Sequence, residues 1–375
     1  MKQRWDIFCA VVDNYGDIGI CWRLARQLAV QHRLAVRLWV DDLRPLARLH
    51  PAADAAAARQ TLSGVEVRRW PAIFPSASGD DIADVVVEAF ACELPPAYLE
   101  AMAQRSPPPL WINLEYLSAE PWVGGCHRMH SPHPRLPLTK HFFFPGFTQE
   151  TGGLLREADY DARRSAFDAA AFRRQLGLPA VAGELAVSLF GYENEEVSGL
   201  LTAWVGGVRP IRCLLPEGRL LPQVAAFFGV SAAVPGSHWR QGSLDVHVLP
   251  FLPQPDYDEL LWSCDLNFVR GEDSFVRAQW AQRPFVWHIY PQQSDHHQIK
   301  LEAFLDLWLK GVPAESAGPI RRFWKAWEGG GSEAAWPGFA AVLPVLAAHS
   351  EAWAQRLLGQ PDLAAQLVSF TMESR

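Results

Sequence analysis

The sequence has no apolar run long enough to cross a membrane, because its longest hydrophobic stretches are interrupted by charged residues or proline. Residues 1–17 are a poor match to a secretory signal, since the apolar part is short, contains Asp6 and is followed by acidic residues. An internal repeat and a low-complexity tract are also missing. These absences predict a globular cytoplasmic protein without a membrane partner.

Paired cysteines and an excess of basic residues are missing as well. The six cysteines show no C-x-x-C spacing, which indicates reduced thiols; they are Cys9, Cys21, Cys92, Cys126, Cys213 and Cys264. The formal net charge is −7, whereas a nucleic-acid-binding protein would carry a basic stripe. We therefore expect no nucleic-acid partner.

At 375 residues, of which 49% are hydrophobic, the chain is long enough for two domains. Strand patterns alternate with helical ones in both halves, which predicts two mostly parallel sheets covered by helices. Residues 119–155 contain so much Pro, Gly and His that we expect long loops there. The expected division is a Rossmann-like domain at 1–155, a linker region at 156–180, a second Rossmann-like domain at 181–345, and helices at 346–375 that pack back on the first domain. Strands are expected at 5–13, 33–42, 65–70, 84–91, 109–117, 184–192, 211–218, 244–252, 265–269 and 284–290.

The junction between the first strand and the first helix carries two acids and two glycines, in the stretch DNYGDIG. Asp17 is well placed to be the N-cap of a helix that begins near Ile18. A pair of carboxylates, Asp13 and Asp17, is also what a catalytic base and its partner would require. Gly16 and Gly19 would let the backbone turn sharply and come close to a substrate.

The second half contains the stretch RGEDS, which ends a strand and opens a helix. A helix start offers unpaired N–H groups and a positive dipole end to an anion, and the Ser274 hydroxyl adds a donor. Glu272 and Asp273 would repel a phosphate, so they would serve sugar hydroxyls or cations instead. Simple capping of the helix explains the same three residues about equally well.

The order of motifs in the second half resembles the nucleotide-sugar half of GT-B glycosyltransferases. A Pro-Gln pair follows one strand, a Ser-containing turn follows the next, and an Asp/Gln-rich loop follows the third. Three longer sequence motifs are more specific than this general order; they are DNYGDIGICWRLARQL, WINLEYLSAE and RGEDSFVRAQWA. In this order they resemble the bacterial protein-arginine rhamnosyltransferases that modify translation elongation factor P, the EarP family, over essentially the whole chain.

That resemblance implies a GT-B fold, in which two Rossmann-like domains face each other across a cleft, with a helical C-terminal tail. It also implies an inverting, metal-independent transfer of L-rhamnose from dTDP-β-L-rhamnose to an arginine of elongation factor P, which activates this factor for translating polyproline stretches. No cofactor is expected. The implied catalytic acids are Asp13, Asp17 and Glu272. The implied donor contacts are Tyr192, Phe251, Gln254, Arg270, Asp273, Ser274 and Tyr290.

The sequence leaves more than one interpretation open for several residues and for the function itself. Glu115 and Tyr116 lie at the carboxyl end of a strand, where they could contact the acceptor or act as a buried cap. His127, His130 and His133 suggest a metal site with Cys126, but their spacing is not a zinc pattern and a solvent loop fits better. Another GT-B enzyme, such as a heptosyltransferase of lipopolysaccharide synthesis, and an inactive GT-B binding module remain alternatives. The residues alone fix neither the acceptor, nor thymine against uracil, nor the oligomeric state.

Overall fold

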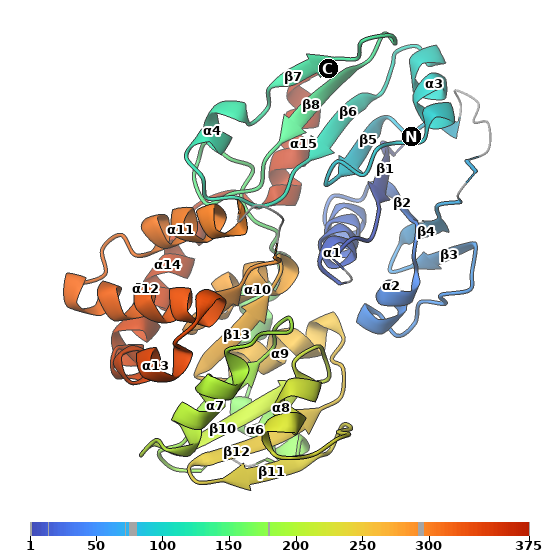
Figure 1. Cartoon of the computed structure of the whole chain (residues 1–375). Helices are drawn as coiled ribbons and strands as arrows, with labels where there is room; N and C mark the ends of the chain where they lie inside the picture. Colours follow the sequence, from blue (N-terminus) through green and yellow to red (C-terminus); the bar gives the residue numbers. More distant parts are fainter. Residues whose placement is uncertain are drawn as a thin grey trace. The chain divides into compact units, whose positions relative to one another are not determined.

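A computed structural model describes residues 2–13, 15–71, 73–74, 81–178, 181–291 and 296–374. The chain forms two compact units, the first from Met1–Ala158 with Leu357–Arg375 and the second from Asp159–Arg356 (Figure 1). The expected boundaries differ from these in two places. Residues 159–178 form helices of the second unit instead of a separate linker, and the return to the first unit begins at Leu357, later than residue 346.

The sheet of the first unit has the strand order β3-β4-β2-β1-β5-β6-β8-β7. The strands from β4 to β8 pair in parallel, and the edge strands β3 and β7 pair antiparallel. The chain order therefore reverses between β1 and β5, which is where α/β proteins bind ligands, at the carboxyl ends of the strands. The strands are β1 (Arg4–Cys9), β2 (Ala35–Val40), β3 (Arg59–Leu62), β4 (Val65–Arg69), β5 (Val85–Ala89), β6 (Leu110–Leu114), β7 (His130–Pro132) and β8 (Thr139–Phe143).

Opposite faces of β1 pack against different helices. Phe8 contributes to a buried cluster with Tyr98, Ala101 and Met102 of α3 (Pro96–Gln104). α1 (Gly16–Val30) buries an apolar face that includes Ile20, Leu24 and Leu28, whose spacing in the sequence is that of one face of a helix. The first unit also contains α2 (Arg44–Leu49), α4 (Trp122–Cys126) and α15 (Leu363–Glu373).

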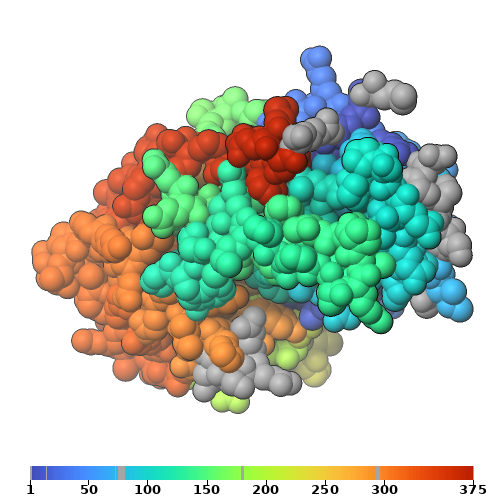
Figure 2. Space-filling model, turned by 90° about the horizontal axis from the view of Figure 1, so that it is seen from above, coloured from blue at the N-terminus to red at the C-terminus, as the bar shows by residue number. Residues whose placement is uncertain are grey.

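The C-terminal helix α15 belongs to the core of the first unit. Asp362 caps this helix by accepting from the N–H groups of Ala364 and Ala365, and it also accepts from the side chain of Gln27 on α1 at 2.7 Å. Phe370 packs on Phe143 of β8, with ring centroids 5.8 Å apart. In the space-filling view the red C-terminal residues lie among blue and teal residues of the first unit (Figure 2).

The sheet of the second unit has the order β11-β12-β10-β9-β13-β14, with β11 antiparallel and the other strands parallel. Its order reverses between β9 and β13, so the residues that follow these two strands are placed for ligand binding. The strands are β9 (Leu185–Leu189), β10 (Ile211–Pro216), β11 (His238–Gln241), β12 (Leu244–Leu249), β13 (Leu266–Arg270) and β14 (Phe285–His288).

Aromatic side chains form much of the core between this sheet and its helices. Phe285 of β14 packs against Trp308 and Trp324, which are buried side chains of α11 and α12. Burial of such side chains contributes ~1.5–3 kcal/mol each. The helices are α5 (Tyr160–Ala166), α6 (Ala169–Gln175), α7 (Val197–Val205), α8 (Leu221–Phe227), α9 (Gln254–Ser263), α10 (Asp273–Ala281), α11 (His296–Trp308), α12 (Ala314–Gly329), α13 (Ser332–Ala341) and α14 (Leu343–Leu358).

The main error in the expected structure concerns residues 119–155. They contain α4, β7 and β8, and β8 pairs in parallel with β6 as a full member of the sheet. The edge strands β3 and β11 were also not expected. Among the residues described above, no helix is both long and apolar enough to span a membrane.

Candidate active site

Asp17 is the most buried acid at the carboxyl end of the first sheet's central strand, with 2% of its surface exposed. Its carboxylate accepts hydrogen bonds from the backbone N–H groups of Val12 at 2.9 Å and Asp13 at 2.7 Å. The expectation that Asp17 is a helix N-cap is wrong, because α1 begins at Gly16 and Tyr15 occupies the N-cap position. Instead, this side chain holds the loop that precedes the helix.

Burial raises the pKa of Asp17 above the ordinary value of an aspartate. The hydrogen bonds from Asp13, Val12 and Tyr116 lower the pKa, but by less than burial raises it, and the charge of Asp41 raises it further. A buried carboxylate with a raised pKa is a stronger base than an exposed one. This is the property that a general base requires.

Asp13 lies in a loop that a second carboxylate also supports. Asp41, which follows β2, accepts from the backbone N–H of Val11 at 2.9 Å. Together with Asp17 it fixes the backbone that presents Asp13, whose side chain is partly exposed. Sequence reasoning missed Asp41, although acids at the carboxyl end of a neighbouring strand, here in the run VDD, were a usable signal.

The two glycines of this junction differ in their surroundings. A Cβ atom added to Gly16 would lie 2.5 Å from Oδ2 of Asp13, so the absence of a side chain lets the Asp13 carboxylate approach the backbone. Gly19 lies inside α1, where its N–H donates to the Tyr15 carbonyl at 2.9 Å. The expected sharp turn at Gly19 is therefore wrong.

Tyr116, which follows β6, contacts the carboxylate of Asp17. The hydroxyl of Tyr116 donates to Oδ1 of Asp17 at 3.2 Å, and its ring stacks on Phe90 with centroids 4.4 Å apart. Glu115 accepts a hydrogen bond from the side-chain amide of Asn113. The structure thus brings Asp13, Asp17 and Tyr116 together at the carboxyl edge of the first sheet.

In the second unit, the turn from β13 to α10 is closed by Ser274. Its hydroxyl accepts from the backbone N–H of Arg270 at 2.9 Å and donates to the Arg270 carbonyl. Glu272 occupies the N-cap position of α10, but its side chain makes no capping hydrogen bond. The simple capping interpretation of Glu272 is therefore wrong, while Ser274 organises the turn.

Gln254 and Asp273 link the starts of two helices. The Gln254 side chain donates to Oδ2 of Asp273 at 3.0 Å, which joins the N-terminus of α9 to that of α10. Phe251 lies just after β12 and is partly exposed. These residues, which sequence analysis selected from separate motifs, follow the carboxyl ends of β12 and β13, two strands of the same sheet that are separated by β10 and β9.

Arg270 lies between two aromatic rings at the reversal point of the second sheet. Its guanidinium is 4.5 Å from the ring centre of Phe190 and 4.8 Å from that of Tyr192. It also donates to the Gly191 carbonyl at 3.4 Å. Tyr192 in turn contacts Tyr290 edge to face at 5.3 Å. A cation held in this way is suited to an anionic ligand.

Two titratable residues beside this group were not predicted. His288 is buried, and burial followed by the charge of Arg270 lowers its pKa to about 4, so its imidazole is neutral. Burial raises the pKa of Glu328 to about 8, although its carboxylate accepts from the Ile289 N–H at 3.2 Å. His288 and Glu328 are noticed only because the fold places them beside this group, and no sequence motif indicates that position.

Two histidines of the segment 126–133, His127 and His133, accept hydrogen bonds from backbone N–H groups. His127 accepts from the Phe144 N–H at 3.1 Å, and burial lowers its pKa to about 4. His133 accepts from the Leu136 N–H at 3.0 Å. Within the described ranges, no metal-ligand cluster includes these residues. The sequence SDHHQ also suggests a helix that begins at Asp295, but this position lies outside the described residues.

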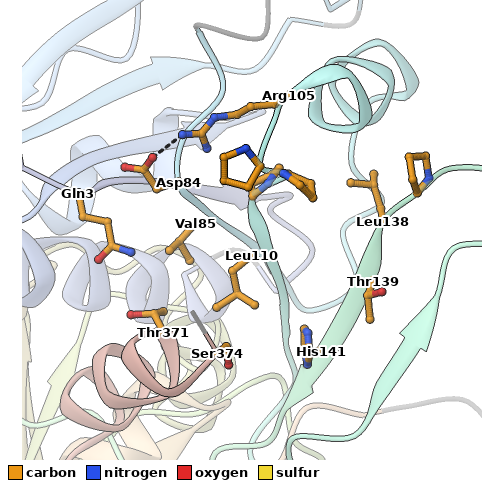
Figure 3. A pocket seen from close by; sticks show the side chains of 14 residues that line it. Gln3, Asp84, Val85, Arg105, Leu110, Leu138, Thr139, His141, Thr371 and Ser374 are labelled. Carbon is orange, nitrogen blue, oxygen red and sulfur yellow. Dashed lines mark hydrogen bonds and ion pairs between the residues drawn. The ribbon is translucent and has the colours of Figure 1, made fainter.

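A cavity of about 550 Å³ in the first unit lies away from these residues. Val85, Leu110 and Thr139 line it from the amino ends of β5, β6 and β8, and Arg105 pairs with Asp84 at its edge (Figure 3). The candidate acids Asp13 and Asp17 lie at the opposite, carboxyl end of the same sheet. This cavity is therefore not part of the candidate active site.

Comparison with known proteins identifies the family. Residues 5–372 match the model of the family described as "Elongation-Factor P (EF-P) rhamnosyltransferase EarP". The chain belongs to the EarP family. This membership makes it a glycosyltransferase and decides against the heptosyltransferase alternative.

Individual relatives agree with this assignment. The chain is 51% identical over 372 residues to the protein-arginine rhamnosyltransferase of Pseudomonas aeruginosa PAO1, covering 98% of each chain. It is 36% identical to that of Neisseria meningitidis serogroup B, covering 97% of this chain and 96% of the relative. A solved structure described as the structural basis for EarP-mediated arginine glycosylation of translation elongation factor EF-P aligns with TM-score 0.71 and 38% identity over 100% of both chains.

More distant structures show the fold alone. The glycotransferase of kitacinnamycin aligns with TM-score 0.54 at 14% identity, covering 98% of each chain. Together with the EarP structure, this likeness establishes the GT-B fold that the motifs predicted. It carries no information about the substrates of the present chain.

Proposed function

We propose that this chain transfers L-rhamnose from dTDP-β-L-rhamnose to a guanidinium nitrogen of one arginine of elongation factor P, with inversion at the anomeric carbon. Membership of the EarP family supports the reaction class and the acceptor. The EarP structure concerned with arginine glycosylation of EF-P supports the acceptor residue type. The donor nucleotide and the stereochemistry rest on the resemblance of the motifs and on the chemistry below.

The observation that carries the proposal is the buried carboxylate of Asp17, with its raised pKa, beside Asp13. An arginine guanidinium is fully protonated in water, so it must lose a proton when its nitrogen forms a glycosidic bond. In the proposed step, the nitrogen attacks the anomeric carbon as the bond to the diphosphate oxygen breaks. Asp17 takes the proton, and Asp13 orients the guanidinium through a charge-assisted hydrogen bond.

On the donor side, the residues around β13 support binding of a nucleoside diphosphate-sugar. Arg270 is a buried cation that can balance the negative charge which develops on the leaving diphosphate. Ser274 and Asp273 shape the start of α10, and Gln254 and Phe251 are assigned to the thymine. Tyr192 and Tyr290 are assigned to the sugar-phosphate, and Glu272 to the sugar or the acceptor.

In this proposal the leaving group is stabilised by Arg270 and by N–H groups at the start of α10, so the transfer needs no metal and no cofactor. Because its acceptor is a translation factor, the proposed place of action is the cytoplasm. Glu115, which lies beside Tyr116, is assigned to acceptor contacts.

An intact-mass assay tests the proposal. The chain is incubated with unmodified elongation factor P and dTDP-β-L-rhamnose in the presence of a chelator, and the product is mapped by tandem mass spectrometry. The expected result is the gain of one deoxyhexose on one arginine. No gain, at a donor concentration that saturates dTDP-rhamnose binding, would reject elongation factor P as the acceptor.

A further inference from the structure

Outside the candidate active site, two histidines and an aspartate gather on the hairpin formed by β11 and β12. His238 lies directly opposite His247 in the antiparallel register of these strands. Asp245 precedes His247 by two residues on β12, and alternate residues of a strand point to the same face. The pairing of the strands therefore places the three side chains together.

The ligand atoms of these side chains are close enough for one ion. Nε2 of His238 lies 2.5 Å from Oδ1 of Asp245, and Nε2 of His247 lies 3.1 Å from Oδ2. All three ligand atoms fall within 4.8 Å of one another. The two imidazole rings stack with centroids 4.3 Å apart and an angle of 14° between their planes, so both Nε2 atoms face the same carboxylate.

A second observation points to a ligand here. Nε2 of His247 is buried, and its contact with Oδ2 of Asp245 at 3.1 Å is an ion-pair contact of poor hydrogen-bond geometry. Buried polar atoms are normally satisfied by a partner. An ion held between the three side chains would supply one.

We propose that His238, Asp245 and His247 form a binding site for a divalent transition-metal ion of the zinc type. Two imidazole nitrogens and one carboxylate oxygen form a donor set that Zn²⁺ prefers, whereas Mg²⁺ and Ca²⁺ prefer oxygen ligands alone. Bonds of ~2.0–2.2 Å in a tetrahedron place ligand atoms roughly 3.3 Å apart. The half-exposed His238 has to rotate outward slightly to reach this spacing, and water can take the fourth position.

A neighbouring cation is compatible with this site. Nε of Arg212 lies 3.8 Å from Oδ2 of Asp245, but its NH2 group is 3.2 Å from Oε2 of Glu184, which offsets its charge. Asp245 can therefore bind the metal through Oδ1 while Oδ2 faces Arg212. Such a contact orients a metal-ligating carboxylate, as partners of metal ligands commonly do.

The three side chains of this site are not among the candidate donor contacts, although two of those contacts, Phe251 and Gln254, follow β12, the strand that carries Asp245 and His247. β11 forms one edge of the second sheet and β14 forms the other. Arg270 and Ser274 belong to β13 and α10, and β10 and β9 separate β13 from β12. β11, β12 and β13 are labelled in Figure 1. A metal here would join the edge strand β11 to β12 and stabilise the hairpin. It has no part in the proposed transfer, so failure of the metal site leaves the proposed function intact.

The test is a titration of tag-free, chelator-treated full-length chain with Co²⁺, followed by competition with Zn²⁺. We expect one equivalent of Co²⁺ with visible d–d bands of nitrogen and oxygen ligation. The affinity should fall at least ~100-fold in His238→Ala and Asp245→Asn, because loss of a direct ligand exceeds the 10–100-fold cost of outer-shell changes. Zn²⁺ should also raise the Tm of the wild-type chain but not that of His238→Ala.

The chain provides a matched control. His130 lies opposite His141 in the antiparallel register of β7 and β8, with ring centroids 5.9 Å apart, so it is a cross-strand histidine pair in the first unit. His130→Ala should leave Co²⁺ affinity unchanged. Absence of stoichiometric binding, equal binding by His238→Ala, or bands of cobalt–thiolate charge transfer would each overturn the proposal. Because His238 is half exposed, its variant is expected to fold, and circular dichroism checks this.

Discussion

At the scale of single residues, the acids of the first unit gain their chemistry from burial. Two backbone N–H groups and the Tyr116 hydroxyl donate hydrogen bonds to the buried carboxylate of Asp17. These hydrogen bonds lower the pKa of Asp17, whereas burial raises it by more, so the net shift is upward. The balance sets the pH at which this base begins to work.

Removing the hydroxyl of Tyr116 should shift this balance. The hydrogen bond from Tyr116 lowers the pKa of Asp17, so Tyr116→Phe should raise that pKa. A general base acts only when deprotonated, so the acid limb of the kcat/KM profile should move to higher pH in the variant. The pH profile of kcat/KM is measured with the donor varied and the acceptor saturating. If the acid limb stays in place or moves to lower pH in the variant, Tyr116 does not lower the pKa of the general base.

Ser274 is the corresponding test on the donor side. Ser274→Ala removes the hydroxyl that bridges the backbone N–H and carbonyl of Arg270, so the turn before α10 should loosen. We expect dTDP affinity to fall roughly tenfold, which is the effect of about one hydrogen bond. Isothermal titration calorimetry with dTDP gives the affinity directly.

A matched serine controls for stability. The Ser263 hydroxyl donates to the Leu260 carbonyl inside the second unit and is also buried. Ser263→Ala should leave dTDP affinity unchanged. Equal losses in the two variants would mean that Ser274 acts through general stability alone.

At the scale of secondary-structure elements, a buried ion pair fixes the helices that carry the donor candidates. Arg277 of α10 donates to Asp258 of α9 through two hydrogen bonds of 2.8 and 2.6 Å, and both side chains are buried. Arg277 also lies over the ring of Tyr160 at 4.3 Å. This pair sets the relative position of Gln254 and Asp273, which begin the same two helices.

Breaking this pair should destabilise the second unit. Asp258→Ala leaves a buried guanidinium without its carboxylate, which costs roughly 3–5 kcal/mol of unfolding free energy. The exposed pairs of Arg321 with Glu302 and Asp306 form the control, since Arg321→Met should cost less than about 1 kcal/mol. Urea unfolding of both variants measures the difference, and similar losses would contradict the account.

The same scale shows what the sequence could and could not predict. The hydrophobic pattern places β1, β5 and β13 within a few residues of their observed bounds, because each is a run of buried apolar residues. β8 was not predicted because Pro137 and the nearby histidines are typical of loops. Phe142 and Phe143 nevertheless lie in this strand.

For the site, motif order found the residues that follow the strands, but not their contacts. The pairing of Asp17 with Val12 and Asp13, and the position of His288 beside Arg270, depend on tertiary packing. The capping preference of aspartate favoured an N-cap role for Asp17, but in the structure Tyr15 occupies that position.

At the scale of the whole molecule, the C-terminal residues complete a unit built mainly from the N-terminal part of the chain. The N–H of Leu363 donates to the Leu154 carbonyl at 3.0 Å. A Cβ atom on Gly153 would lie 2.5 Å from the Pro361 carbonyl oxygen, so the two segments are in tight contact. The first unit therefore depends on residues far away in the sequence.

Truncation tests this dependence. Deleting residues 357–375 should expose the apolar face formed by Phe143 and its neighbours and destabilise the first unit, while the second unit stays folded. Hydrogen exchange followed by mass spectrometry should show faster exchange in β1, β6 and β8 but unchanged exchange in β9 and β13. Uniformly faster exchange in both units would contradict this division.

The central claim is that the buried carboxylate of Asp17 is the base that accepts the arginine proton. The most direct measurement is the single-turnover rate of rhamnose transfer by Asp17→Asn at saturating dTDP-β-L-rhamnose. The account predicts a rate at least ~100-fold below that of the wild-type chain, the usual effect of losing a general base, with dTDP affinity unchanged. A rate within a few-fold of wild type, or a variant that no longer binds dTDP, would contradict it.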